Sequence, residues 1–120
     1  VTYHVRHSSE WIIRLGDGTA ESHRRAQDAL DELWSFTDEL FEMDEVDALL
    51  IKEGIAVDLN TLRAEWDQLV DEVLGKATLV RPAMKGYQSK GGIYGNHTEH
   101  LGHMLSEMQF LPRAYPDAKW

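Results

Sequence analysis

Apolar residues recur at intervals of three and four through most of the chain, the spacing that places them along one side of an α-helix. The pattern is clearest between residues 20 and 43, where the apolar positions are Ala26, Ala29, Leu30, Leu33, Trp34, Leu40 and Phe41. No segment shows the alternation of apolar and polar residues that is typical of a strand. The spacing therefore predicts an all-α chain, and an antiparallel helical bundle is the simplest arrangement of its helices.

Capping and helix-breaking residues predict where the first helices begin and end. A helix over residues 1–15 should stop at Gly16, which is suited to a left-handed helix end. Thr19 should cap a single helix over residues 20–43, about 36 Å long. Asp44 should cap a short acidic helix that ends near Lys52.

The same reasoning divides the rest of the chain. We expect residues 55–57 to form a buried connector, and Asp58 to cap a helix that ends at Gly75. Asn96 or Thr98 should cap the last helix, which we expect to end at Pro112. The terminal Trp120 suggests that the tail is held by packing.

The first residues, Val1 to His4, are already in helical register and include no helix-start residue. We therefore expect the chain to begin inside a helix and to be part of a longer polypeptide; a processed form of a complete domain is the alternative. A partial bundle leaves apolar side chains uncovered. We expect it to be completed by its own N-terminal half, by another copy or by a partner subunit.

The charge and composition exclude several classes of function. The chain has 21 acidic and 12 basic residues and a formal charge of −9, which opposes binding to nucleic acids and to anionic membranes. It has no apolar run long enough to cross a bilayer, and no cysteine for a thiolate nucleophile or ligand. The sequence indicates a soluble cytoplasmic protein.

Three histidines, His97, His100 and His103, recur every third residue in the last predicted helix. Projected on that helix, His97 lies in the apolar face, His100 at its edge and His103 on the polar side, so the three cannot meet one ion. No histidine in the chain follows a glutamate by three residues, the spacing used in di-iron bundles. We predict no catalytic residue and no metal site in this chain.

The favoured interpretation of these histidines is a polar seam between helices, formed by His4, His7, His97 and His100. In this interpretation His4 shares a buried stripe of the first helix with Trp11. The alternative is a metal-binding helical enzyme domain that uses His4, His97 and His100.

Residues 76–96 contain Pro82 and several glycines, so they predict a long, basic, glycine-rich loop. Loops of this length in compact domains are often functional, although an ordinary connecting loop is the other interpretation.

Several stretches, in order over nearly the whole chain, resemble the PaaC subunit family of bacterial ring-1,2-phenylacetyl-CoA epoxidases. The stretches are Tyr3-His4-x-Arg6-His7, Trp11, Arg14-Leu15-Gly16-Asp17-Gly18-Thr19, Leu33-Trp34-x-Phe36-Thr37-x-Glu39-Leu40-Phe41, Glu53-Gly54-Ile55-Ala56-Val57-Asp58, His97-Thr98-Glu99-His100-Leu101-Gly102, Glu107-Met108-Gln109 and Trp120. The resemblance covers the C-terminal half of the usual length in that family.

The resemblance implies that residues 1–120 are the C-terminal part of a ferritin-like helical domain. It implies a non-catalytic structural subunit in aerobic phenylacetate catabolism, which self-associates and binds the catalytic subunit PaaA. PaaA would carry the di-iron site and epoxidise phenylacetyl-CoA, with electrons from NADPH delivered through a reductase, so no cofactor is expected in this chain. The local reversal of charge in the loop motivates a further hypothesis, in which Arg81, Lys85 and Lys90 contact coenzyme A phosphates or an acidic face of the partner.

Overall fold

A computed structural model describes residues 1–83 and 86–119. Within these ranges every regular element is helical, so the predicted fold class is confirmed. The chain divides into two compact units, residues 1–90 and residues 91–120. No helix in the described part is both long and apolar enough to cross a membrane.

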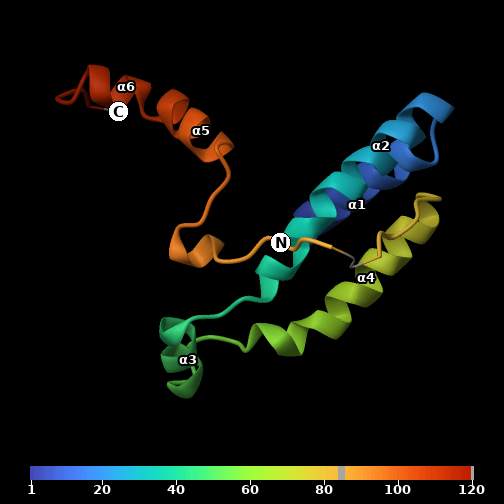
Figure 1. Cartoon of the computed structure of the whole chain (residues 1–120), viewed down its shortest axis with the longest axis horizontal. Coiled ribbons are helices and arrows are strands. Elements are labelled where there is room, and N and C mark those ends of the chain that lie inside the picture. The colour runs from blue at the N-terminus through green and yellow to red at the C-terminus, as the bar shows by residue number, and fades with distance from the viewer. Residues whose placement is uncertain (84–85, 120) are drawn as a thin grey trace. The chain divides into compact units, whose positions relative to one another are not determined.

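The first unit is built on three long helices, α1 (Thr2–Gly16), α2 (Ala20–Leu33) and α4 (Arg63–Lys76). Figure 1 shows α1 lying along α2, and α1 also packs against α4. The short helix α3 (Glu45–Lys52) stands between two 3-10 helices, η1 (Trp34–Phe41) and η2 (Leu59–Leu62). Two long helices thus contact α1 and leave its remaining face open.

The predicted N-terminal caps of this unit are confirmed. The side chain of Thr19 accepts a hydrogen bond from the amide of Ser22 at 3.2 Å and starts α2. Asp44 accepts from the amide of Asp47, and the Asp47 carboxylate accepts in return from the amide of Asp44, which is a capping box. Asp58 caps η2, which leads into α4, rather than an α-helix directly.

The prediction of a single helix over residues 20–43 is wrong. The α-helix α2 ends at Leu33, and the 3-10 helix η1 follows it directly. Two contacts favour the tighter winding. The Ser35 carbonyl accepts from the amide of Ser89 at 2.8 Å, and the Thr37 hydroxyl donates to the Trp34 carbonyl at 2.8 Å. Carbonyls that are engaged in this way are less available for regular α-helical bonds.

Gly16 does not form a left-handed helix end, contrary to the prediction. It is the last residue of α1, and Asp17 follows with a φ of −92°. Its lack of a side chain serves a close approach instead, because a Cβ built on Gly16 would lie 2.3 Å from the Ala77 carbonyl oxygen. The helix α4 also runs one residue beyond the predicted end at Gly75.

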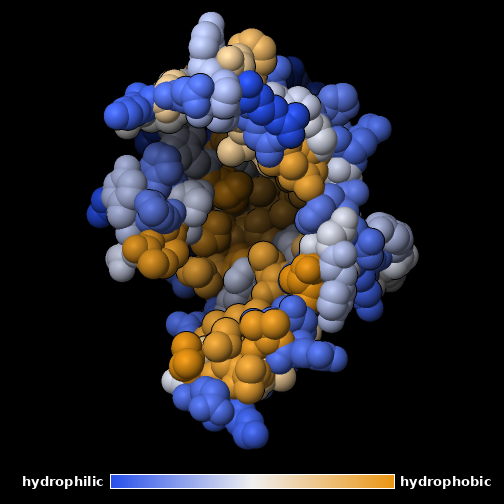
Figure 2. Space-filling model, turned by 90° about the vertical axis from the view of Figure 1, so that its left-hand side faces the viewer, coloured by the Kyte–Doolittle hydropathy of each residue, from blue (hydrophilic) through white to orange (hydrophobic). Residues whose placement is uncertain are grey.

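The core of the first unit is small and consists of Trp34, Leu74, Ala77 and Leu79. Many large apolar side chains remain exposed, and Figure 2 shows broad patches of them in orange. Ile55 and Val57 are among the exposed residues, so the predicted buried connector is wrong for this chain. The helices of the first unit therefore bury less apolar surface than their sequence offers.

The second unit contains the 3-10 helix η3 (Gly92–Tyr94) and two short helices, α5 (His100–Met108) and α6 (Phe110–Ala114). The sequence predicts Asn96 or Thr98 as the cap of the last helix and Pro112 as its end. In the structure α5 begins at His100 without a side-chain cap, and the helix is interrupted at Gln109. Pro112 does not end it but lies in the first turn of α6, where proline is tolerated. The tail up to Lys119 is exposed, and Trp120 lies outside the described residues.

Candidate functional site

The histidines of α1 stand in an exposed row of rings. The ring of Tyr3 stacks on that of His7 with centroids 5.7 Å apart, and His7 meets the ring of Trp11 edge-on at 6.4 Å. The guanidinium of Arg14 lies 5.3 Å from the centre of the Trp11 ring. His4 is exposed, so its predicted burial with Trp11 is wrong for this chain.

The histidine string of the second unit is not a single helical face. His97 precedes α5 and is exposed, while His100 is the first residue of the helix and His103 lies one turn further on. The predicted burial of His97 is therefore wrong, because the helical projection does not apply to a residue outside the helix. Among the described residues, no group of three or more His, Cys, Asp or Glu side chains could hold a metal ion.

Arg81 links the loop that follows α4 to that helix by ion pairs. Its guanidinium forms ion pairs with Asp67 and, at 2.7 Å, with Asp71. It also lies 5.0 Å from the centre of the Trp34 ring. Arg81 thus anchors the loop, whereas Lys90 is exposed and Lys85 lies outside the described residues. Phosphate or partner contact by these three residues stays a prediction.

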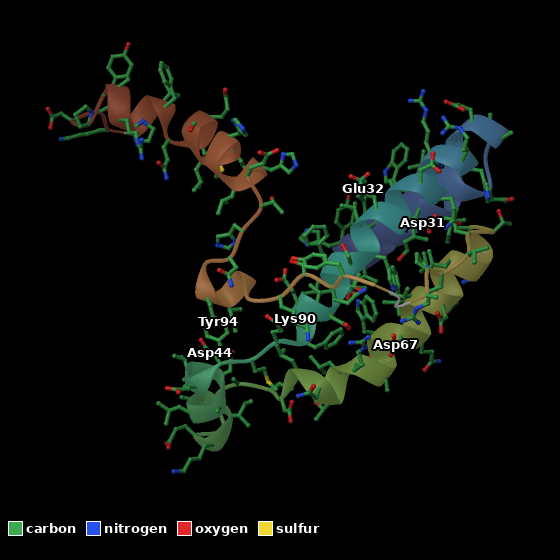
Figure 3. All side chains as sticks on the ribbon, viewed as in Figure 1. Asp31, Glu32, Asp44, Asp67, Lys90 and Tyr94 are labelled. Atoms are coloured by element: carbon green, nitrogen blue, oxygen red, sulfur yellow. The ribbon has the colours of Figure 1, made fainter. Side chains whose placement is uncertain are left out.

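Asp67, which Figure 3 labels on α4, forms ion pairs with Arg81 and with a second arginine, Arg63. The guanidinium of Arg63 lies 3.4 Å from Asp67 Oδ2 and donates to Asp38 Oδ1 at 2.8 Å. Both guanidinium groups lie 5.7 Å from the centre of the Trp66 ring. We call Asp38, Arg63, Trp66, Asp67 and Arg81 the Trp66 cluster.

The Trp66 cluster ties η1, α4 and the following loop together, and its hydrogen bond from Arg81 lowers the pKa of Asp67. The sequence reasoning missed it. The four-residue spacing of Arg63, Asp67 and Asp71 places them along one side of a helix, and this spacing could have indicated part of the cluster. The bond to Asp38, 25 residues away, has no local signal.

We expect the free energy of unfolding to fall less on acidification in Asp67→Asn than in the wild-type chain. A carboxylate whose pKa is lowered by folding stabilises the fold above its ordinary value near 3.9, and this contribution is lost as the pH falls through the folded pKa. The wild-type chain should therefore lose more free energy of unfolding between pH 6 and pH 3 than the variant. Urea unfolding at each pH measures this. Equal pH dependence in Asp67→Asn and the wild type would contradict the assignment.

A wide apolar groove of about 810 Å³ opens in the first unit. Its walls come from α1, α2 and α4, and its lining includes Val5, Ile12, Ala29, Leu33, Leu69 and Val73. Trp34 and Trp66 both line the groove, so the Trp66 cluster adjoins it. Such a surface is suited to packing against a helix rather than to acid–base chemistry.

Comparison with known proteins agrees with the sequence motifs. The chain is 50% identical over 118 residues to a subunit of the 1,2-phenylacetyl-CoA epoxidase of Escherichia coli (strain K12). The match covers 98% of this chain and 47% of the relative, so the chain spans about half the length of that relative. The family model for "Phenylacetic acid catabolic protein" matches residues 1–120. The chain therefore belongs to the phenylacetic acid catabolic protein family, which has a ferritin-like helical fold.

Proposed function

We propose that this chain is part of a non-catalytic structural subunit of a multicomponent di-iron monooxygenase that epoxidises phenylacetyl-CoA in aerobic phenylacetate catabolism. The observation that carries the proposal is the 50% identity to an epoxidase subunit over 98% of the chain. The acidic, cysteine-free composition supports a cytoplasmic location for the complex.

The residues that could bind iron support a structural rather than a catalytic role for this chain. None of the six histidines follows a glutamate by three residues, the pair that grips a di-iron centre in helical bundles. His4 and His97 are both exposed, and the described side chains do not fit a di-iron centre. We therefore assign the iron and the oxygen chemistry to the partner subunit PaaA, with NADPH supplying electrons through a reductase. No observation favours the alternative metal-binding enzyme domain built on His4, His97 and His100.

This chain would provide the complex with an interaction surface. Its first unit exposes large apolar side chains along three helices, which is typical of an element that is covered in its assembly. The exposed amine of Lys90 remains the candidate contact of the basic loop with coenzyme A phosphates or with acidic residues of PaaA.

We expect this chain to co-purify with PaaA when the two are expressed together and only PaaA carries a tag. The complex should persist through gel filtration at a fixed ratio of the two chains. Lys90→Glu should weaken it or weaken acyl-CoA binding by the complex, whereas Lys52→Glu, which alters an exposed lysine of α3, should do neither. Recovery of PaaA without this chain would count against the proposed function. Unchanged behaviour of Lys90→Glu would remove only the loop contact.

A further inference from the structure

An apolar patch lies on the short helix α3 and on the segment that follows it, away from the groove. Its side chains are between 56% and 74% exposed, and the described groove lining includes none of them. Figure 2 shows this lower end of the first unit as an orange area edged with blue. We call these residues the α3 patch: Val46, Leu49, Ile55 and Val57.

Main-chain hydrogen bonds at the end of α3 hold the patch together. Gly54 has a φ of 71°, the left-handed conformation in which many helices end. The Gly54 amide donates to the Ile51 carbonyl at 3.0 Å, and the Ile55 amide donates to the Leu50 carbonyl at 2.9 Å. These two bonds form a Schellman motif, in which the residue after the glycine turns back toward the last turn of the helix. The motif therefore keeps Ile55 near the end of α3 that carries Leu49.

Acidic residues lie around the α3 patch. Residues 38–58 contain eight acidic residues and one basic residue, Lys52. Asp38 is paired with Arg63 at 2.8 Å, but no ion pair in the described part of the chain includes the exposed Glu45 or Glu53. An apolar surface edged by negative charge is complementary to a surface with lysine and arginine around an apolar centre. We propose that the α3 patch binds a basic, apolar surface of a protein partner.

The negative charge also disfavours the other occupants of an exposed apolar patch. Two copies of this chain that met at their α3 patches would place like charges opposite each other, which is unfavourable. Anionic membranes and nucleic acids would be repelled for the same reason. A basic protein surface is the occupant that fits both the apolar centre and the acidic edge. The inference uses neither PaaA nor iron, so it is independent of the proposed function.

The test uses as its probe a synthetic amphipathic helix of leucine and lysine, compared with the same helix made of leucine and glutamate. Fluorescence anisotropy measures the binding of each to this chain. We expect the leucine–lysine helix to bind at least tenfold more tightly. The double variant Leu49→Ser, Ile55→Ser should weaken that binding at least tenfold. The matched control is Leu33→Ser, Leu69→Ser, which alters two exposed leucines of the groove and should leave the binding unchanged.

Reversal of charge at the edge of the patch gives a second readout. In Glu45→Lys, Glu53→Lys the preference should be exchanged, so that the leucine–glutamate helix binds more tightly. Glu32→Lys, Glu65→Lys is the matched control, because each pair alters two exposed glutamates, one in the first turn of a helix and one at a helix end. This control should keep the wild-type preference.

Three results would each overturn the inference. The first is equal binding of the two synthetic helices by the wild-type chain. The second is an equal loss of binding in the patch and groove variants, which would place the probe in the groove. The third is an exchange of preference in the control pair, which would show that net charge alone decides the binding.

Discussion

Replacing Trp34 with alanine should remove most of the stability of the first unit. Trp34 is only 5% exposed and is the largest side chain in a buried cluster that otherwise contains Leu74, Ala77 and Leu79. Its ring packs against Trp66 at 6.0 Å and under the guanidinium of Arg81. Truncating a buried aromatic residue costs about 3–5 kcal/mol, a large share of the roughly 5–15 kcal/mol that stabilises a typical domain.

The measurement for Trp34→Ala is urea unfolding followed by far-ultraviolet circular dichroism. Trp11→Ala is the matched control, because it removes the same side chain from an exposed position of α1, where Trp11 is 48% exposed. We expect Trp34→Ala to lower the free energy of unfolding several times more than Trp11→Ala. Similar losses in the two variants would show that the core does not centre on Trp34.

Replacing Gly16 with valine should separate the end of α1 from the end of α4. Even a single Cβ on Gly16 would lie 2.3 Å from the Ala77 carbonyl oxygen and 2.8 Å from the Ala77 Cβ, and Ala77 is fully buried. The Gly16 carbonyl also contacts two neighbouring segments, because it lies 2.7 Å from Nδ1 of His23 in α2 and accepts from the hydroxyl of Thr78, which follows α4, at 3.4 Å. The backbone cannot move aside without breaking these bonds.

We expect Gly16→Val to lower the free energy of unfolding by about 1–3 kcal/mol, the usual cost of overpacking, and Gly16→Ala to lower it by less. Gly75→Ala is the control, since it adds a Cβ to a helical glycine with nothing within 4 Å. Alanine favours a helix over glycine by about 1 kcal/mol, so Gly75→Ala should be neutral or stabilising. Equal effects at the two glycines would contradict the close contact.

Local signals in the sequence predicted the starts of α2 and α3, because a cap depends on residues within one turn. Thr19 and Asp44 are examples, and both form the expected hydrogen bonds. The change to a 3-10 helix at Trp34 was not predictable in this way, since one of the two contacts that favour it is a bond from Ser89, which is distant in the sequence. Gly16 was misread for the same reason: a glycine that permits a close contact and one that permits a left-handed turn are identical in sequence.

The predictions for the candidate site residues failed for comparable reasons. Arg81 was predicted to contact coenzyme A phosphates or a partner subunit because the loop around it is basic. Its observed partners, Asp67 and Asp71, lie on the preceding helix. His97 was placed in a helix because its spacing from His100 fits one, but the helix begins at His100. Spacing can indicate which residues would share a face of a helix, but it does not show that the helix extends to them.

We infer that this chain belongs to a structural subunit and that the iron of the epoxidase is held by another subunit. The most direct test is to purify the complex of this chain with PaaA, separate the two chains under conditions that retain tightly bound metal, and count the iron in each. We expect two iron ions per PaaA chain and none above background with this chain. Iron that stays with this chain in a fixed ratio, and that is lost in His4→Ala or His97→Ala, would contradict it.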